Sequence, residues 1–140
     1  MKHLFLVNPA AGKRGSTEAL LRRVEEAFSP LGLEHEVVLT SSAGDAEQLA
    51  RRAACSGGPV RIYACGGDGT LNEVVNGAAG YPNAAVTNVP KGTGNDFLRI
   101  FGANYAARFS DLAALSRGPQ AAFDQVGGQA VLGRQGILTT

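Results

Sequence analysis

The chain has 140 residues, the size of one domain with a single core, and its 13 Lys and Arg against 12 Asp and Glu leave a formal net charge of +1. So small an excess excludes the basic surface of a nucleic-acid-binding protein, and no apolar run approaches the roughly 18 residues that cross a bilayer. The two cysteines, Cys55 and Cys65, fit no zinc spacing or disulfide framework, and the start shows no secretory signal, so we expect a cytoplasmic protein.

Short β-rich runs alternate with helical periods through most of the chain. The expected elements are, in order, strand 3–7, a helix capped by Ser16 that stops before Pro30, strand 34–40, a helix from Asp45 to Gly57, strand 60–64, helix 70–77 and strand 84–89. Thr70 and Glu73 have the T-x-x-E spacing of a capping box at the start of the third helix. Two more helices are expected, over about 96–101 and 105–116.

The alternation of strands and helices predicts βαβ crossovers and therefore an α/β fold. We expect a Rossmann-like three-layer domain over residues 1–119, with a mostly parallel sheet and helices on both faces. Residues 120–140 do not continue the alternation of strands and helices. They predict a hairpin around Gly127–Gly128 and a further strand at 137–138, with no helix to complete them, and we interpret them as the start of a connection to another unit.

Glycine is unusually frequent, at 19 of 140 residues, and it clusters where strands are expected to pass into helices. Three of these junctions read NPAAG at 8–12, GGDGT at 66–70 and GTGND at 92–96. In a parallel sheet all three lie at the carboxyl edge, where open α/β folds bind ligands. Glycine lets backbone N–H groups approach an anion closely, and each loop leads into the partially positive N-terminus of a helix. The pattern therefore predicts a phosphate-binding edge.

Acidic residues stand inside the two glycine-richest loops, at Asp68 and Asp96, and a third, Asp124, lies in the strand expected over 121–126, the first strand of the hairpin. A carboxylate beside a phosphate repels it unless a divalent cation such as Mg²⁺ lies between them. Because the chain also lacks G-x-G-x-x-G and the Walker pattern, this arrangement favours metal-assisted phosphoryl transfer. The alternatives are that Asp68 is a turn residue, that Asp96 caps a helix and that Glu73 only completes the capping box.

Together, the segments NPAAG, GGDGTLNEVVNG and PKGTGNDFLR resemble the motifs of the diacylglycerol kinase catalytic domain family, which is related to sphingosine and ceramide kinases. The resemblance covers essentially the whole chain. It implies an ATP-dependent lipid kinase that transfers the γ-phosphoryl group of Mg-ATP to a diacylglycerol-like lipid hydroxyl. The implied nucleotide contacts are Asn8, Pro9, Ala10, Ala11, Gly12, Thr40, Gly66, Gly67, Asp68, Gly69, Thr70, Leu71, Asn72 and Thr93. Asp68 and Asp96 are the implied catalytic residues and, with Asp124, the implied magnesium ligands, directly or through water.

Members of this family continue into a β-rich second domain that supplies the general base and much of the lipid pocket. Nothing in this sequence corresponds to that domain, so we interpret the chain as the nucleotide-binding half and expect it to be inactive by itself. The lipid substrate implies transient contact with a membrane surface, and unpaired strand edges after Pro119 suggest a homodimer. Ala11 stands where the family's first motif usually has Ser or Gly, which removes a hydroxyl contact but keeps the backbone donors.

Two other classes of function remain open. A kinase of a soluble acceptor, similar to NAD kinases, shares the GGDGT loop, although Asn95-Asp96-Phe97 argues against it. A nucleotide-binding module without chemistry of its own is the third class.

Overall fold

The computed structural model describes residues 1–90, 121–122, 125–126, 129–130 and 137–139. Within residues 1–90 the elements are β1 (Lys2–Val7), α1 (Ser16–Phe28), β2 (His35–Leu39), α2 (Asp45–Cys55), β3 (Val60–Gly66), α3 (Asp68–Ala78) and β4 (Ala84–Pro90). The later described residues form the short strands β5 (Ala121–Ala122), β6 (Gln125–Val126), β7 (Gln129–Ala130) and β8 (Ile137–Thr139). The helices expected over 96–101 and 105–116 lie outside the described residues.

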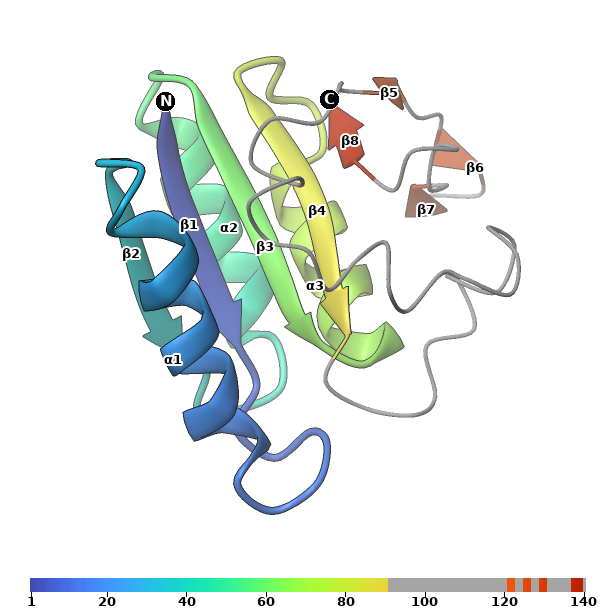
Figure 1. The fold of residues 1–140 in the computed structure, drawn as a ribbon. Helices are drawn as coiled ribbons and strands as arrows, with labels where there is room; N and C mark the ends of the chain where they lie inside the picture. Colours follow the sequence, from blue (N-terminus) through green and yellow to red (C-terminus); the bar gives the residue numbers. More distant parts are fainter. Residues whose placement is uncertain (91–120, 123–124, 127–128, 131–136, 140) are drawn as a thin grey trace.

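One sheet joins most of these strands in the order β2-β1-β3-β4-β8-β5. β1 pairs in parallel with β2 and with β3, and β3 pairs in parallel with β4, so that Phe5 lies between Val37 and Tyr63. α1 covers one face of the sheet, and α2 and α3 cover the other (Figure 1). The predicted Rossmann-like three-layer α/β fold, with a mostly parallel sheet and helices on both faces, is therefore confirmed.

Burial follows the position of each strand in the sheet. β1 and β3 lie inside the sheet between the helix layers, and every residue of β3 and every residue of β1 after Lys2 is buried. Strands that are covered on both faces have continuous apolar runs for this reason. β2 forms an edge of the sheet, and its residues are only half-buried or exposed. The apolar runs at 4–7 in β1 and 62–65 in β3 therefore mark the central strands, and Arg61 is buried in β3 beside the second of these runs.

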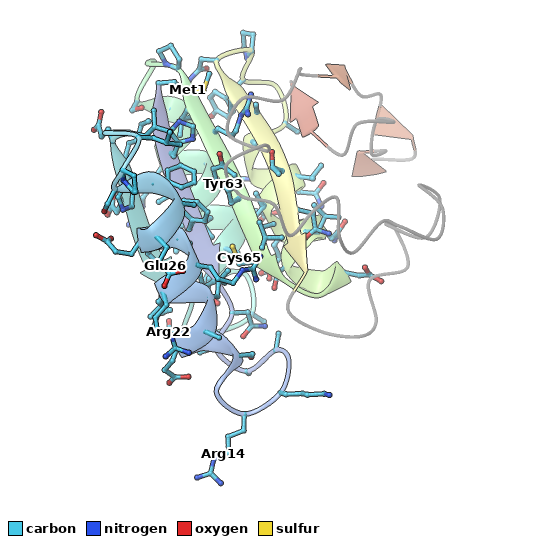
Figure 2. The ribbon with its side chains drawn as sticks, in the orientation of Figure 1. Met1, Arg14, Arg22, Glu26, Tyr63 and Cys65 are labelled. Carbon is cyan, nitrogen blue, oxygen red and sulfur yellow. The ribbon has the colours of Figure 1, made fainter. Side chains whose placement is uncertain are left out.

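An aromatic cluster fills the core between β1, β3 and α1. The rings of Phe5 and Tyr63 stack with their centroids 4.2 Å apart, and Phe28 meets Phe5 edge-on at 5.1 Å. Figure 2 shows Tyr63 on the side of the sheet that α1 covers. His3 joins these rings: its Nδ1 lies 2.9 Å from the Tyr63 hydroxyl, and only 3% of the residue is exposed. Burial, together with the nearby charge of Arg61, lowers the pKa of His3 to about 4. His3 is therefore a neutral core residue near neutral pH.

The start of α1 differs from the sequence prediction. Its N-cap is Gly15, whose φ of 82° lies in the left-handed region that favours glycine, and no side chain caps the helix. Ser16 is the first residue of the helix rather than its cap, and its Oγ lies 3.4 Å from the Ala11 carbonyl oxygen. The prediction of Ser16 as the N-cap is wrong because the preceding glycine makes the turn into the helix.

The start of α3 also differs. The helix begins at Asp68, earlier than the expected Thr70, and its N-cap is Gly67 in an extended conformation with no side-chain cap. The predicted capping box is therefore wrong, because Thr70 and Glu73 both lie inside the helix. The helix continues to Ala78, so Gly77 is an interior residue instead of the end of the helix.

The strands after residue 120 lie in two places. β6 and β7 pair antiparallel, with Gln125 opposite Ala130, and this confirms a hairpin around 127–128. β8 joins the main sheet antiparallel to β4, and β5 pairs with β8 in parallel. These late strands extend the sheet beyond β4, whereas the division of the chain at residue 119 stays a prediction. In the part of the chain that the structure describes, every helix is too short or too polar to cross a bilayer.

α2 and α3 lie side by side on one face of the sheet and pack through small residues (Figure 1). Ala46, Ala50 and Ala54 of α2 are buried. A Cβ added to Gly77 would overlap the backbone carbonyl oxygen of Glu47 and would lie 2.9 Å from the Ala50 Cβ. Gly77 therefore permits the close approach of the two helices, although a glycine inside a helix costs about 1 kcal/mol relative to alanine.

The substitution Gly77→Ala is expected to destabilise the domain by about 2 kcal/mol. Alanine gains about 1 kcal/mol of helix propensity, but overpacking costs about 3 kcal/mol where the neighbour is a backbone carbonyl that cannot rotate away. Gly69→Ala is the matched control in the same helix, because a Cβ there would meet no atom within 4 Å. Urea denaturation measures both variants. Equal free energies of unfolding in the two variants would contradict the close packing of α2 on α3.

Candidate functional site

A cavity opens at the carboxyl edge of the sheet, where the strand arrows of β1, β2 and β3 end (Figure 1). Its volume is about 400 Å³. Its lining comes from the segments that follow β1, β2 and β3: Asn8, Pro9 and Ala10; Thr40, Ser41, Ser42 and Ala43; and Gly69, Thr70 and Glu73. Ligands of open α/β folds bind at this edge. The sequence predicted the same edge, and the structure shows which of its residues surround an open space.

A larger hollow of about 490 Å³ lies along α2 and is lined by Gln48, Arg51, Arg52, Cys55 and Ser56. Its described lining residues include no glycine-rich loop and no carboxylate, and all of them come from α2 and the residue after it. Size alone therefore does not identify the site. The smaller cavity at the sheet edge combines convergent loops with helix N-termini and is the better candidate.

The loop after β1 is shaped by Asn8. The Asn8 Oδ1 accepts a hydrogen bond of 3.0 Å from the Ala10 N–H, which forms an Asx-turn, and the Asn8 N–H donates to the Cys65 carbonyl oxygen at 2.9 Å. Gly12 then turns the chain with a φ of 81°. Pro9 and Ala10 are exposed at the cavity, whereas Ala11 and Gly12 complete the turn outside its lining. Asn8 thus has a structural role in addition to its place at the cavity.

Arg14 and Arg22, two basic residues beyond this loop, point away from the cavity (Figure 2). Figure 2 shows Arg14 at the tip of the loop, pointing away from the domain, and Arg22 on the outer side of α1. Both residues are exposed. These two arginines therefore bring no positive charge to the cavity, whereas the N-termini of helices carry partial positive charge on their backbone N–H groups.

The glycines after β3 fall into two groups. Gly66 is required by packing, because a Cβ there would lie 2.5 Å from the Thr70 Oγ1 and 3.4 Å from the Asn8 Cβ. Gly67 and Gly69 have no such requirement: neither has a positive φ, and a Cβ at either position would meet no atom within 4 Å. Within the residues that the structure describes, neither backbone conformation nor packing gives a reason for glycine at these two positions. Close approach of a ligand to the backbone is a physical reason that remains.

Asp68 is the first residue of α3 and is half-buried. A carboxylate in the first turn of a helix interacts favourably with the helix dipole, so Asp68 has a structural role as well as a candidate chemical one. Among the described residues, no three His, Cys, Asp or Glu side chains gather into a metal site. A single carboxylate still fits Mg²⁺, which keeps several waters and takes further oxygens from substrate phosphates. The other predicted acids, Asp96 and Asp124, and the predicted contact Thr93 lie outside the described residues.

The segment after β2 supplies cavity lining that the sequence analysis missed, namely Ser41, Ser42 and Ala43. Thr40, which was predicted here, donates its N–H to the Val7 carbonyl oxygen at 2.8 Å and so continues the pairing with β1 past the end of β2. The position of these residues in the sequence could have indicated that they line the site. They directly follow a parallel strand at the edge where the other loops meet, and two of them have hydroxyl groups.

The predicted contacts on α3 separate in the structure. Thr70 and Glu73 line the cavity. Leu71 is 2% exposed and belongs to the core. Asn72 is exposed, and its backbone and side-chain oxygens both accept hydrogen bonds from the Asn76 amide. Residues three apart on the helix therefore face the cavity, and the two residues between them point elsewhere.

Residues 2–126 match the family described as "Diacylglycerol kinase catalytic domain". The chain is 42% identical over 99 residues to the diacylglycerol kinase of Bacillus subtilis, an alignment that covers 70% of this chain and 32% of that protein. It is 44% identical over 99 residues to a Staphylococcus aureus diacylglycerol kinase, covering 68% and 30% of the two chains. A solved diacylglycerol kinase structure from Bacillus anthracis aligns with a TM-score of 0.69 and 26% identity, covering 94% of this chain and 45% of that one. The chain thus spans about a third of the length of the curated relatives it matches.

Proposed function

Because this chain belongs to the diacylglycerol kinase catalytic domain family, we propose that it is the nucleotide-binding part of an ATP-dependent lipid kinase. Mg-ATP is the proposed phosphoryl donor, and its binding site is the cavity at the carboxyl edge of the sheet. The proposed reaction moves the γ-phosphoryl group of ATP to a lipid hydroxyl.

The two unexplained glycines of the GGDGT segment carry this proposal. Gly67 and Gly69 stand at the N-terminus of α3, and neither backbone geometry nor packing against the described residues requires glycine there. A triphosphate that approaches the first-turn N–H groups of α3 needs that free space and benefits from the positive end of the helix dipole. The Thr70 side chain lines the same cavity and offers a hydroxyl to the ligand.

Phosphoryl transfer depends mainly on positioning and on neutralising the charge of the phosphates. Mg²⁺ supplies part of that neutralisation when it is bound. Asp68 is the described residue proposed to hold the ion, directly or through water, and Asp96 and Asp124 are proposed to join it on the family resemblance alone. The N–H groups at the start of α3 would stabilise the charge that develops on the transferred group.

The identity of the molecule that accepts the phosphoryl group is proposed from the relatives of this chain. Those in Bacillus subtilis and Staphylococcus aureus are diacylglycerol kinases, so a diacylglycerol-like lipid is the first candidate substrate. Such a substrate requires transient contact with a membrane surface from the cytoplasmic side. Formation of a homodimer through strand edges also stays a prediction.

The 140-residue chain is expected to bind Mg-ATP without phosphorylating diacylglycerol by itself. Transfer needs an acceptor hydroxyl held in line with the γ-phosphate, usually with a base to take its proton, and the family resemblance places the base in a second, β-rich domain. Titration with a fluorescent ATP analogue measures binding. Radiolabelled ATP with diacylglycerol in mixed micelles measures transfer, and the full-length gene product is assayed beside the chain.

Each outcome of this experiment has a distinct meaning. Equal turnover by the isolated chain and the full-length gene product would contradict the two-part mechanism. Phosphorylation of NAD instead of lipid by the full-length gene product would favour the kinase of a soluble acceptor. ATP binding with no transfer by either protein would favour a nucleotide-binding module, and absence of ATP binding would overturn the proposal.

A further inference from the structure

Glu73 connects two helices that are far apart in the sequence. It lies in α3 and is half-buried, and its Oε1 accepts a hydrogen bond from the backbone N–H of Gly44, the N-cap of α2. Glu73 also lines the cavity at the sheet edge. Because the capping box predicted for this residue does not form, its carboxylate is available to α2 instead of to its own helix.

A second carboxylate supports the other end of the same loop. The Asp45 Oδ2 accepts hydrogen bonds from the Ser41 N–H at 2.9 Å and from the Ser41 Oγ at 3.3 Å. Asp45 thus holds the first residue of the loop 41–44, and Glu73 holds the last. Between these two attachments, Ser42 and Ala43 form part of the cavity wall. The shape of this wall therefore depends on two carboxylates that point toward the N-terminus of α2.

These carboxylates distinguish the two helix N-termini that face the cavity. The N-terminus of α2 has Asp45 and Glu47 in its first turn and the Glu73 carboxylate on its N-cap. The N-terminus of α3 has only Asp68 in its first turn and is preceded by Gly67. Negative charge repels an anionic polyphosphate from the α2 side and leaves the α3 side as its place. An uncharged nucleoside does not experience this repulsion, so the wall formed by 41–44 remains accessible to it.

We propose that Glu73 is a positioning residue, which holds loop 41–44 in place by its hydrogen bond to Gly44 so that this loop forms the wall for the nucleoside part of the nucleotide. This inference rests on the proposed nucleotide-binding function and adds a role that the glycine-rich segment does not show. Glu73 acts through Gly44 and the loop, and it takes no part in the transfer of the phosphoryl group.

The test compares ATP with inorganic tripolyphosphate, which has the phosphates of ATP but no nucleoside, on the 140-residue protein by isothermal titration in the presence of Mg²⁺. Glu73→Ala is expected to weaken ATP binding about tenfold, the effect of losing a hydrogen bond to a charged acceptor, and to leave tripolyphosphate binding unchanged. Glu73→Gln should restore ATP binding to within about twofold, because its amide oxygen can accept the same hydrogen bond from Gly44.

Two further variants complete the set. Glu73→Asp keeps the charge but is one methylene too short to reach Gly44, so it should weaken ATP binding as Glu73→Ala does, and it replaces that variant if alanine prevents folding. Glu26→Ala is the control, because Glu26 is exposed on α1 and points away from the domain (Figure 2). Thermal unfolding followed by circular dichroism verifies that each variant is folded.

The possible results separate the inference from the function on which it rests. Normal ATP affinity in folded Glu73→Ala and Glu73→Asp variants would overturn the positioning role and leave the proposed function intact. Equal weakening of ATP and tripolyphosphate would also overturn it, because Glu73 would then support the phosphate-binding end of α3. Absence of ATP binding by the unmodified protein would overturn the proposed function itself.

Discussion

Gly67→Val is expected to abolish detectable binding of Mg-ATP, with a loss of affinity of at least about a hundredfold. The valine methyl groups would occupy the space in which the phosphates approach the first-turn N–H groups of α3. Losing two hydrogen bonds to charged oxygens costs about 3 kcal/mol or more, which corresponds to that factor. Because Gly67 has a negative φ and no neighbour within 4 Å of its missing Cβ, the fold itself should tolerate the substitution.

Gly58→Val is the matched control for this prediction. Gly58 precedes β3 at the opposite edge of the sheet from Gly67, and a Cβ there would also meet no atom within 4 Å. Isothermal titration with Mg-ATP measures both variants, and urea denaturation verifies that both are folded. Unchanged nucleotide affinity in a folded Gly67→Val protein would remove the phosphate site from the N-terminus of α3.

Asp68→Ala is expected to lower turnover of the full-length gene product by about a hundredfold to a thousandfold. A carboxylate that helps to hold Mg²⁺ acts on charge that develops during the transfer, so its removal affects kcat more than the binding of ATP. The fold should be retained, because Asp68 stands in the first turn of α3, where losing the favourable interaction of a carboxylate with the helix dipole costs about 0.3–1 kcal/mol. The measurement is kcat and KM for ATP at saturating Mg²⁺ with diacylglycerol in mixed micelles.

Two companion variants separate charge from structure at this position. Asp68→Asn keeps the size of the side chain and removes its charge, so it should lose turnover to a similar extent as Asp68→Ala. Glu26→Ala, on the outer side of α1, should leave turnover unchanged (Figure 2). If Asp68→Ala and Asp68→Asn both retain full turnover, the acid of GGDGT serves only the N-terminus of the helix.

The glycines of GGDGT show how much of the candidate site could be predicted from the sequence. The pattern predicted that GGDGT binds phosphate, and it assigned the same purpose to all three of its glycines. The structure separates them, because Gly66 is required by the Thr70 side chain that packs against it, whereas Gly67 and Gly69 remain open. No rule of spacing could make this distinction, since it depends on where the side chain of Thr70 turns after the helix begins.

At Glu73, by contrast, the capping-box rule, which depends only on local sequence, gave a wrong prediction. The T-x-x-E spacing fits a capping box, but Gly67 begins the helix earlier than the rule required, and this places Thr70 and Glu73 inside it. The Glu73 carboxylate then meets the N–H of Gly44, a residue of another βα junction. Leu71 was likewise predicted as a contact within a binding segment, although its side chain is part of the core.

The sequence by itself determined the α/β class, the parallel direction of the first strands and the family to which the chain belongs, and it predicted the edge of the sheet at which the cavity lies. These properties follow from hydrophobic periods, glycine positions and motifs, all of which are local in the chain. Only the tertiary structure decided that loop 41–44 forms a cavity wall, that Gly77 lies against α2, and that β8 joins the sheet antiparallel to β4. Each of these depends on contacts between residues far apart in the sequence, and such contacts are set by how helices and strands pack together rather than by any period within one element.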